Sequence, residues 1–487
     1  MSIKNDAADR LGKESVGKLL IKFSIPAIVG MLVNALYNVV DRIFVGQGVN
    51  EIALGGLSLV LPLMTIGMAF AMLFGIGTAN MISMRLGQGR KQEAQNALKH
   101  CFFLLLGTGL LIMVLGLTFL DPILSLMGAS EGSQALLYAR EYFRIILYGI
   151  VFFLIGFGLS HCTRAQGFPN ITMIGMLLGA VLNIILDYLF IMKFNWGVQG
   201  AAYATIISQF VSMVFILCFI MSKRAVVKLD LSLFHKKPLC EKEDLKVKIW
   251  SRFKPEPDII LQIMAFGSAQ FLLQFMISAA QLLTNKSIGW YAVAAFGTDN
   301  SADIALSGMN IVGSILMLII MPVFGINQGA QPILGYNYGA KLFRRVLRTY
   351  VSAVAAATLI CVFGFVIVQL FSVQLVQLFT PNGSAELMAF APRAMRLMML
   401  VLPIGGLMII SINFFVVTGR PKTSIFLSML RQCIILIPCI LIFGKIWGVW
   451  GIVAATPISD SLSFIVISIM AGMELKKLYQ QSDVNKK

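Results

Sequence analysis

The sequence is poor in the side chains that build metal sites, disulfide frameworks and polar catalytic centres. Its 487 residues include three histidines and seven cysteines, and no two cysteines form a C-x-x-C pair. Zinc sites and disulfide frameworks need such residues in clusters, so we expect neither of them, and no cofactor. Charged residues make up 13% of the chain, against about 25% in soluble domains. These absences argue against an enzyme and against a soluble protein.

Apolar residues dominate what is present. They make up 58% of the sequence, and the mean hydropathy is +0.85. About 20 apolar residues in a helix cross the hydrocarbon core of a bilayer, so the apolar runs predict an all-α polytopic membrane protein with twelve transmembrane helices. The helices are expected to begin near Phe23, Ala53, Cys101, Tyr142, Thr172, Val198, Ile259, Ile304, Val346, Arg396, Ser424 and Val449.

The formal net charge of +17 is concentrated in the connections between the apolar runs. When the connections are assigned alternately to two sides, 31 Lys and Arg fall on the side of the amino terminus and eight on the other. Basic loops stay in the cytoplasm, so both termini are expected there, in a multi-pass protein of the inner or plasma membrane. Orientation accounts for the basic charge, and no nucleic-acid partner is expected. Residues 1–16 lack a small-residue cleavage pattern, so no cleavable signal peptide is predicted.

Short segments recur at a nearly constant shift along the chain. Residues 52–56 recur at 304–308 and residues 167–169 at 419–421, both with a shift of 252, and residues 196–200 recur at 447–451 with a shift of 251. Each half then holds six helices, an even number, so both halves enter the membrane from the same side. Parallel repeats around a central cavity are typical of transporters.

The repeat predicts that the chain is divided into five segments. They are a cytoplasmic amino-terminal segment (1–22), an N-lobe (23–221), a cytoplasmic linker (222–258), a C-lobe (259–471) and a cytoplasmic tail (472–487).

Asn183 and Asp187 stand four residues apart inside the apolar run of the fifth helix. This spacing places both side chains on one helix face. An ionisable residue at membrane depth costs at least ~2.5 kcal/mol on insertion scales and usually faces a cavity or the bundle interior. We therefore interpret Asp187 as an ion-coupling carboxylate. The alternative is that it only hydrogen-bonds a neighbouring helix.

The first helix carries a second polar stripe. Its members are Asn34, Tyr37, Asn38 and Asp41, spaced i, i+3, i+4 and i+7. A cavity between the first and fifth helices could therefore hold both Asp41 and Asp187. The alternative for Asp41 is an interfacial ion pair with Arg42 near the outer end of the helix.

Three further sets of polar residues lie inside predicted helices. Thr205 and Gln209 could form a third wall of the cavity, or could be ordinary packing contacts. Gln270 and Gln274 share a stripe of the seventh helix, where they can bind a ligand but cannot titrate. Asp460 is the carboxylate inside a helix of the second half, and a structural role is as plausible for it as an ion site.

Pro26 lies inside the first helix near its cytoplasmic end. A proline removes one backbone hydrogen bond and can kink or hinge a helix. We predict that Pro26 is a hinge.

Three motifs carry a resemblance to the multidrug and toxic compound extrusion (MATE) family along essentially the whole chain. They are residues 38–46, residues 179–187 and the segment 322–340, which contains Gln328, Gly329 and Gln331. The resemblance implies a V-shaped pair of six-helix lobes and export of cationic amphiphilic compounds driven by an inward H⁺ or Na⁺ gradient. The chain is similar to the branch with two first-lobe aspartates, Asp41 and Asp187, accompanied by Asn183 and Tyr37.

We therefore expect a secondary active antiporter, with H⁺ and Na⁺ both open as coupling ions. Its partners are expected to be cationic or amphiphilic drugs and membrane lipids, and the protein is expected to be a monomer. The alternative within the same superfamily is a flippase for lipids or lipid-linked oligosaccharides, which would need a cationic cavity for phosphates. An intramembrane enzyme would need a nucleophile and base, or a metal cluster, and the sequence shows neither.

Overall fold

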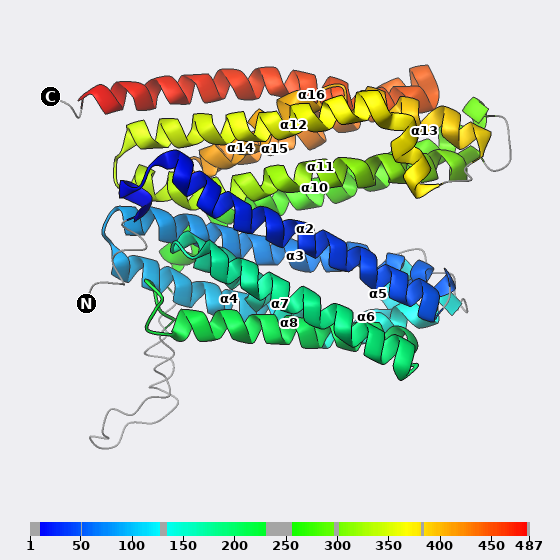
Figure 1. Cartoon of the computed structure of the whole chain (residues 1–487), viewed down its shortest axis with the longest axis horizontal. Helices are drawn as coiled ribbons and strands as arrows, with labels where there is room; N and C mark the ends of the chain where they lie inside the picture. The colour runs from blue at the N-terminus through cyan, green and yellow to red at the C-terminus, as the bar shows by residue number, and fades with distance from the viewer. Residues whose placement is uncertain are drawn as a thin grey trace.

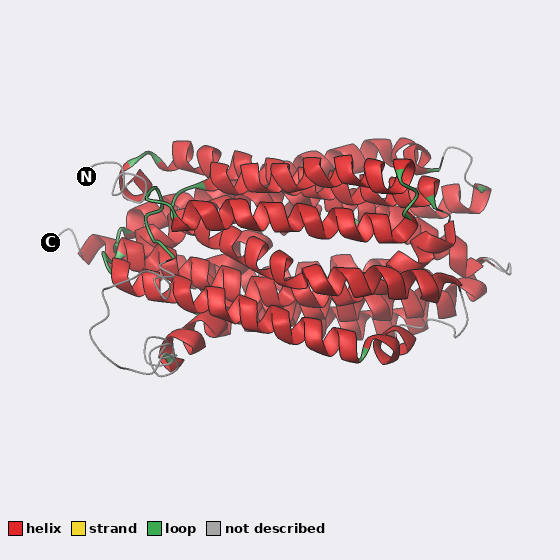
Figure 2. Ribbon diagram, turned by 90° about the horizontal axis from the view of Figure 1, so that it is seen from below, coloured by secondary structure: helices red, strands yellow, loops and turns green. Residues whose placement is uncertain are grey.

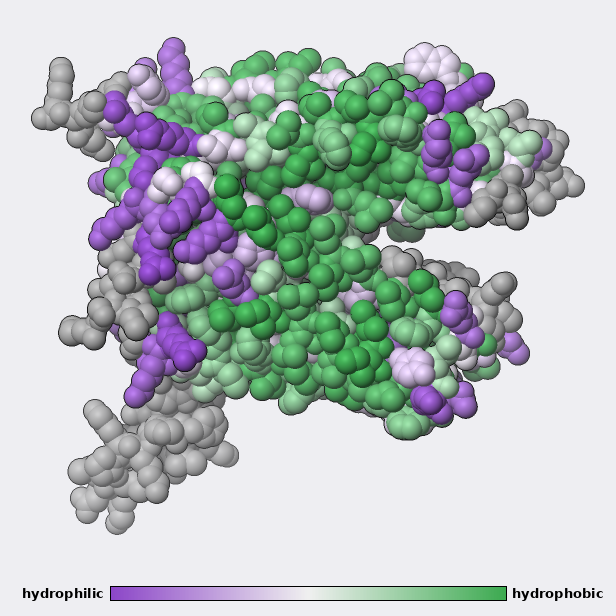
Figure 3. Space-filling view, viewed as in Figure 1, coloured by the Kyte–Doolittle hydropathy of each residue, from purple (hydrophilic) through white to green (hydrophobic). Residues whose placement is uncertain are grey.

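The computed structural model describes residues 10–49, 51–126, 134–229, 256–296, 301–380 and 384–484. Within these ranges the regular structure is helical throughout (Figures 1 and 2). The exposed surface is apolar around the middle of the molecule, and hydrophilic residues gather at its two ends (Figure 3). Large apolar side chains such as Leu111, Leu359 and Phe363 are more than half exposed. A surface of this kind is stable against lipid, as expected of a multi-pass membrane protein.

The helices fall into two sets. The first set is α2 (Val16–Gly48), α3 (Glu51–Gly87), α4 (Lys91–Thr118), the short α5 (Leu120–Leu126), α6 (Gln134–Ala165), α7 (Pro169–Asp187) with its π-helical continuation η1 (Tyr188–Lys193), and α8 (Gly197–Met221). The second set is α10 (Pro257–Phe296), α11 (Ser301–Gly339), α12 (Phe343–Phe379), α13 (Ala385–Met398), α14 (Leu402–Val417), α15 (Pro421–Met429), the π-helical η3 (Leu430–Leu436) and α16 (Ile437–Val484).

Twelve membrane crossings follow from these helices. Ten helical segments of the described chain are long and apolar enough to cross a membrane, and α13 and α14, bent by 50°, form an eleventh. The last segment, Pro421–Ser482, has 62 residues and is interrupted at Gly448, where φ is 60° and ψ is −139°. Gly448 lets the chain reverse, because this left-handed conformation suits glycine. The segment therefore counts as two crossings, and the predicted number of helices is confirmed.

The internal repeat is visible in backbone geometry and hydrogen bonds. Gly167 and Gly419 both have positive φ, 99° and 78°, just before a proline that starts a helix. The Thr172 hydroxyl donates to the Ser160 carbonyl oxygen at 3.2 Å. At the same shift of 252 residues, the Ser424 hydroxyl donates to the Ile412 carbonyl oxygen at 2.8 Å. The two halves therefore fold alike even where their side chains differ.

Glycines bring the two lobes into backbone contact at the end of the molecule that holds the termini. A Cβ atom added to Gly267 on α10 would lie 1.8 Å from the Leu73 carbonyl oxygen on α3. A Cβ added to Gly77 would lie 2.1 Å from the Ile263 oxygen. Only glycine permits helices to approach this closely. At the opposite end Figure 3 shows a notch between the lobes, so they form a V that opens away from the termini.

Hydrogen bonds between neutral amides and guanidinium groups join the lobes at the same closed end. Gln331 donates to Asn80 at 2.6 Å. Arg164 donates to Gln328 at 2.5 Å, and Arg85 donates to Gln262 at 3.2 Å. In these three bonds each acceptor is an uncharged amide oxygen, so none of them is an ion pair.

The helix α2 contacts both lobes. Near its start, Ser24 and Ile28 pack against Gly329 and Gly325 of α11, where added Cβ atoms would lie 2.6 Å and 2.5 Å from them. One turn later, Gly30 packs against Met176 of α7 in the first lobe. Pro26 is buried inside α2, within the stretch that contacts α11. It therefore lies close to the point where α2 changes partners.

The boundaries differ from the predicted ones mainly at helix starts. The helix α4 begins at Lys91 and α6 at Gln134, two to three turns before the predicted starts at Cys101 and Tyr142. Polar residues continue these helices into water beyond the bilayer, so hydropathy underestimates their length. The beginning of the predicted linker packs on the first lobe, where the Val227 amide donates to the Gln166 side chain at 2.8 Å. The linker residues 230–255 lie outside the described residues.

The glycine contact between α3 and α10 generates a prediction. Gly267→Ala forces these backbones apart and should destabilise the closed end by about 1–3 kcal/mol, the usual cost of overpacking. The melting temperature of the purified protein should fall. Gly107→Ala is the matched control, because an added Cβ there has no neighbour within 4 Å. It should be neutral or slightly stabilising, and equal melting temperatures for both variants would contradict the proposed role of the contact.

Candidate ion-coupling and substrate site

A cavity of about 110 Å³ lies inside the first lobe, between α2, α6, α7 and α8. Five residues selected from the sequence line it: Asn34, Tyr37, Asn183, Thr205 and Gln209. The remaining lining residues are mostly aromatic or small: Phe152, Phe153, Gly156, Phe157, Ser160, Met176, Gly179, Ala180, Ser208 and Ser212. The polar stripes of three helices therefore converge on one space, with an aromatic wall opposite them.

Asp187 lies at the carboxyl end of α7 and is fully buried. In the described part of the chain, no amide, hydroxyl or basic group donates a hydrogen bond to its carboxylate oxygens. Asp41 of α2 is near enough to interact with it electrostatically. Neither acid is among the residues that line the cavity, so the expected cavity holding both is not seen; the half-buried Asp41 and the buried Asp187 lie beside it, near the lining residue Asn183. Repulsion opposes both acids being charged at once.

The chain continues from Asp187 into the π-helical turn η1. Single π-helical turns are rare and occur frequently at functional sites. The Tyr188 amide lies at this change of winding and bonds to the carbonyl oxygens of both Ile184 and Ile185. The carboxylate therefore sits where the regular hydrogen bonding of α7 changes.

A chain of polar groups connects α7, α8 and α6 beside the two acids. Asn183 donates from Nδ2 to the Thr205 hydroxyl at 3.5 Å, and the Thr205 and Tyr142 hydroxyls share a hydrogen bond. Tyr142 is buried, and the charges of Asp41 and Asp187 reach its hydroxyl. The Asn183 Oδ1 atom is buried and lacks a partner among the described residues. The site therefore offers an unused amide oxygen as well as carboxylates.

Sequence reasoning missed Tyr142 as a site residue and used it only as a helix start. Its neighbours Phe143, Ile145 and Ile146 are apolar and buried, so no polar stripe accompanies it. The one available signal was a phenol at the edge of an apolar run.

Other residues selected from the sequence lie elsewhere or are not described. Gln270 and Gln274 are half-buried on α10 in the other lobe and do not line this cavity. The side chains of Asn38 and Arg42 lie outside the described residues.

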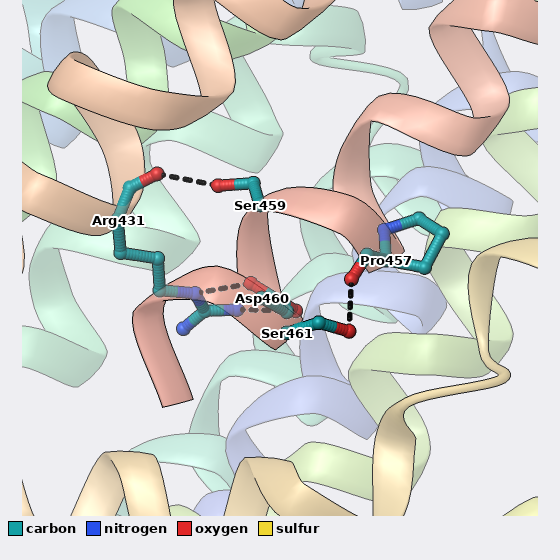
Figure 4. A network of polar contacts seen from close by, with 5 residues as sticks. All are labelled: Arg431, Pro457, Ser459, Asp460 and Ser461. Carbon is teal, nitrogen blue, oxygen red and sulfur yellow. Dashed lines mark hydrogen bonds and ion pairs between the residues drawn. The ribbon is translucent and has the colours of Figure 1, made fainter. Parts of the chain in front are cut away.

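The second lobe has an ion pair where the first has its cavity (Figure 4). Arg431 of η3 donates from Nε and Nη2 to the two Asp460 oxygens at 2.7 Å and 3.2 Å. The repeat aligns Arg431 with Gly179 and Asp460 with Gln209, both of which line the first-lobe cavity. Asp460 is therefore held by a guanidinium, whereas Asp187 faces another acid.

In the described part of the chain no three His, Cys, Asp or Glu residues come together as a metal site would require. The candidate site is thus a pair of acids with amide and hydroxyl groups.

Comparison with known proteins identifies the family. The MatE family model matches residues 26–189 and 268–442. The multidrug export protein MepA of Staphylococcus aureus (strain MSSA476) is 24% identical over 454 residues, covering 92% of each chain. An outward-facing multidrug resistance MATE transporter has a TM-score of 0.84 and 27% identity, and the match covers 97% of this chain and 98% of that one.

A transporter from Pyrococcus furiosus has a TM-score of 0.85 and 26% identity, with 96% of this chain and 98% of that one covered. It is described as having a binding pocket of reversed polarity that suggests a different function. The family match covers more than half of the present sequence and includes both lobes. The chain therefore belongs to the MatE family and is a multi-pass membrane transporter, not an enzyme.

Proposed function

We propose that this protein is a secondary active antiporter that exports cationic amphiphilic compounds in exchange for H⁺ or Na⁺. The observation that carries the proposal is the buried Asp187 carboxylate, which lies beside the Asp41 carboxyl and accepts no hydrogen bond from an amide, hydroxyl or basic group of the described residues. An isolated buried charge is very costly. A proton, a sodium ion or a cationic substrate would each neutralise the pair, and each excludes the others. Competition between the coupling ion and the substrate for one pair of acids is the proposed physical basis of their exchange.

The lining of the cavity supports a cationic amphiphile as the substrate. Among the described residues around it there is no Lys or Arg, while three phenylalanines form one wall. Aromatic faces attract cations as well as apolar groups. Multidrug export by MepA and by the outward-facing relative agrees with such a substrate.

The site contains groups that could bind either of the two candidate coupling ions, Na⁺ or H⁺. Sodium could use the free Asn183 Oδ1 atom with the carboxylates, because hard cations prefer oxygen ligands. A proton could be shared by Asp41 and Asp187, as in other close carboxyl pairs. Everted membrane vesicles, given a pH gradient or a Na⁺ gradient alone, would show which one drives uptake of a fluorescent cation. Uptake under neither gradient would overturn the antiport proposal.

The exchange requires the lobes to change their contacts while the site stays intact. We propose that α2 bends at Pro26 when the occupant of the acid pair changes, because this helix carries Asp41 and also packs on α11. Cytoplasmic placement of both termini, which puts the open end of the V outside the cell, belongs to the same proposal and rests on the distribution of Lys and Arg.

A flippase for lipids or lipid-linked oligosaccharides is the alternative. It would need basic groups for phosphate in its cavity. The acidic site of the first lobe argues against it. The proposed antiporter needs no partner chain and would act as a monomer, with lipids around it.

The first prediction on the site concerns its acids. Asp187→Asn keeps the size of the side chain but cannot titrate, so gradient-driven export of a cation such as ethidium should fall to background. Asp41→Asn should reduce export strongly. Vesicle transport assays at matched protein amounts would measure both.

Two controls separate coupling from other effects. Gln274→Ala removes no charge and should alter affinity at most. The double variant Arg431→Gln, Asp460→Asn removes both charges of the second-lobe pair, leaving no buried ion unpaired, and should still couple. Export by Asp187→Asn, with loss of coupling in the double variant, would show that the acid pair has been assigned to the wrong lobe.

Pro26 generates a separate prediction. Pro26→Ala restores a backbone donor and removes the hinge, so substrate binding should remain while turnover slows several-fold. Fluorescence titration of the purified variant and initial transport rates would measure the two quantities. A wild-type rate would show that Pro26 is only an ordinary residue near the helix start.

A further inference from the structure

A second cavity lies at the other end of the first lobe, away from the termini. It has a volume of about 510 Å³ and lies between the end of α4, the short α5 and the first half of α6. Its lining residues are Leu117, Leu120, Asp121, Leu137, Arg140, Glu141, Arg144 and Tyr148. None of these lines the cavity between α2, α6, α7 and α8, so the two cavities are distinct.

The second cavity exists because one face of α6 is left uncovered. Leu137, Glu141, Arg144 and Tyr148 are exposed and stand three or four residues apart, hence on one side of the helix. Arg140, beside Glu141, is exposed on the same side of the helix, whereas Tyr142, Phe143 and residues 145–147 are buried. The exposed face closes beyond Tyr148, where the Phe152 ring contacts Phe210. The result is a groove that is open at the outer end of α6 and closed toward the middle of the membrane.

The charges along this groove are only partly paired. Arg140 donates to Asp121 at 2.8 Å, which satisfies one acid and one base. Arg144 and Glu141 have no ion-pair or hydrogen-bond partner in the described part of the chain. Among the described residues, the unpaired Arg144 and Glu141, three residues apart on one helix, therefore face the same cavity.

The depth of Arg144 matches the boundary between lipid headgroups and hydrocarbon. About 20 helical residues cross the hydrocarbon core. Counted from Arg164 at the other end of α6, they reach back to Ile145. Arg144 thus stands at the outer boundary, beside Tyr148, and tyrosine favours this interface. Below the groove, Leu110, Leu111 and Val114 of α4 present exposed apolar surface for acyl chains.

We propose that this groove binds the headgroup of a zwitterionic phospholipid that carries a primary amine. Arg144 receives the phosphate, because guanidinium and phosphate form paired, charge-assisted hydrogen bonds. Glu141 accepts hydrogen bonds from the ammonium group, and Leu117 and Leu137 cover the glycerol and the upper acyl chains. The four charged residues of the groove sum to zero, which favours a neutral lipid over an anionic one. The proposal does not depend on the transported substrate.

The test compares headgroups on the purified full-length protein. Short-chain phosphatidylethanolamine should raise the melting temperature more than phosphatidylcholine, whose quaternary ammonium cannot donate a hydrogen bond, and more than anionic phosphatidylglycerol. Inorganic phosphate without acyl chains should have no effect. Equal shifts for the three lipids, or a larger shift with phosphatidylglycerol, would overturn the proposal.

Variants locate the binding site. Arg144→Gln should weaken phosphatidylethanolamine binding about tenfold, as expected for one charge-assisted contact. Glu141→Gln should abolish the preference over phosphatidylcholine. Arg393→Gln, an exposed arginine of the other lobe, is the matched control and should bind like wild type. Native mass spectrometry of retained lipid would measure all three, and unchanged binding in both groove variants would refute the site.

Discussion

One unfavourable interaction constrains the first lobe, the repulsion between the buried Asp187 and the half-buried Asp41. Asp187 accepts no hydrogen bond from an amide, hydroxyl or basic group of the described residues, and Asp41 is its electrostatic neighbour. Full ionisation of such a pair is unfavourable, because the low-dielectric surroundings do not screen two negative charges. Asn183, Thr205 and Tyr142 join three helices beside the pair and hold its surroundings in place. The remaining helices supply the low-dielectric scaffold that makes the repulsion effective.

The two lobes share a fold but differ in how their buried carboxylates are paired. Their backbones agree at Gly167 and Gly419 and in the hydrogen bonds of Thr172 and Ser424. In the second lobe, however, Arg431 neutralises Asp460 within the protein itself. An internal pair of this kind is already satisfied and responds weakly to ions from solution. The two lobes therefore share a backbone scaffold and differ in the polar side chains that face each lobe's interior.

Hydropathy, charge asymmetry and the 252-residue shift were sufficient to predict the number of helices and their repeat. They succeed because a bilayer imposes a fixed length and polarity on every crossing. Asn34, Tyr37, Asn183 and Thr205 could be grouped by helical periodicity alone. Contacts between helices that are far apart in the sequence could not be predicted from periodicity. Tyr142 carried no periodic signal, and the pairing of Arg431 with Asp460 depends on the chain reversal at Gly448.

The glycine contacts between the lobes have a consequence for the speed of opening. Gly77 and Gly267 have no rotamers to lose when α3 and α10 meet and none to regain when they part. A contact built from long side chains would order up to ~2 kcal/mol of conformational entropy per residue each time it formed. At this contact the backbones of α3 and α10 meet directly. Any separation of the lobes would therefore reorder only the side chains around it, such as Arg164 and Gln328, and not the contact itself.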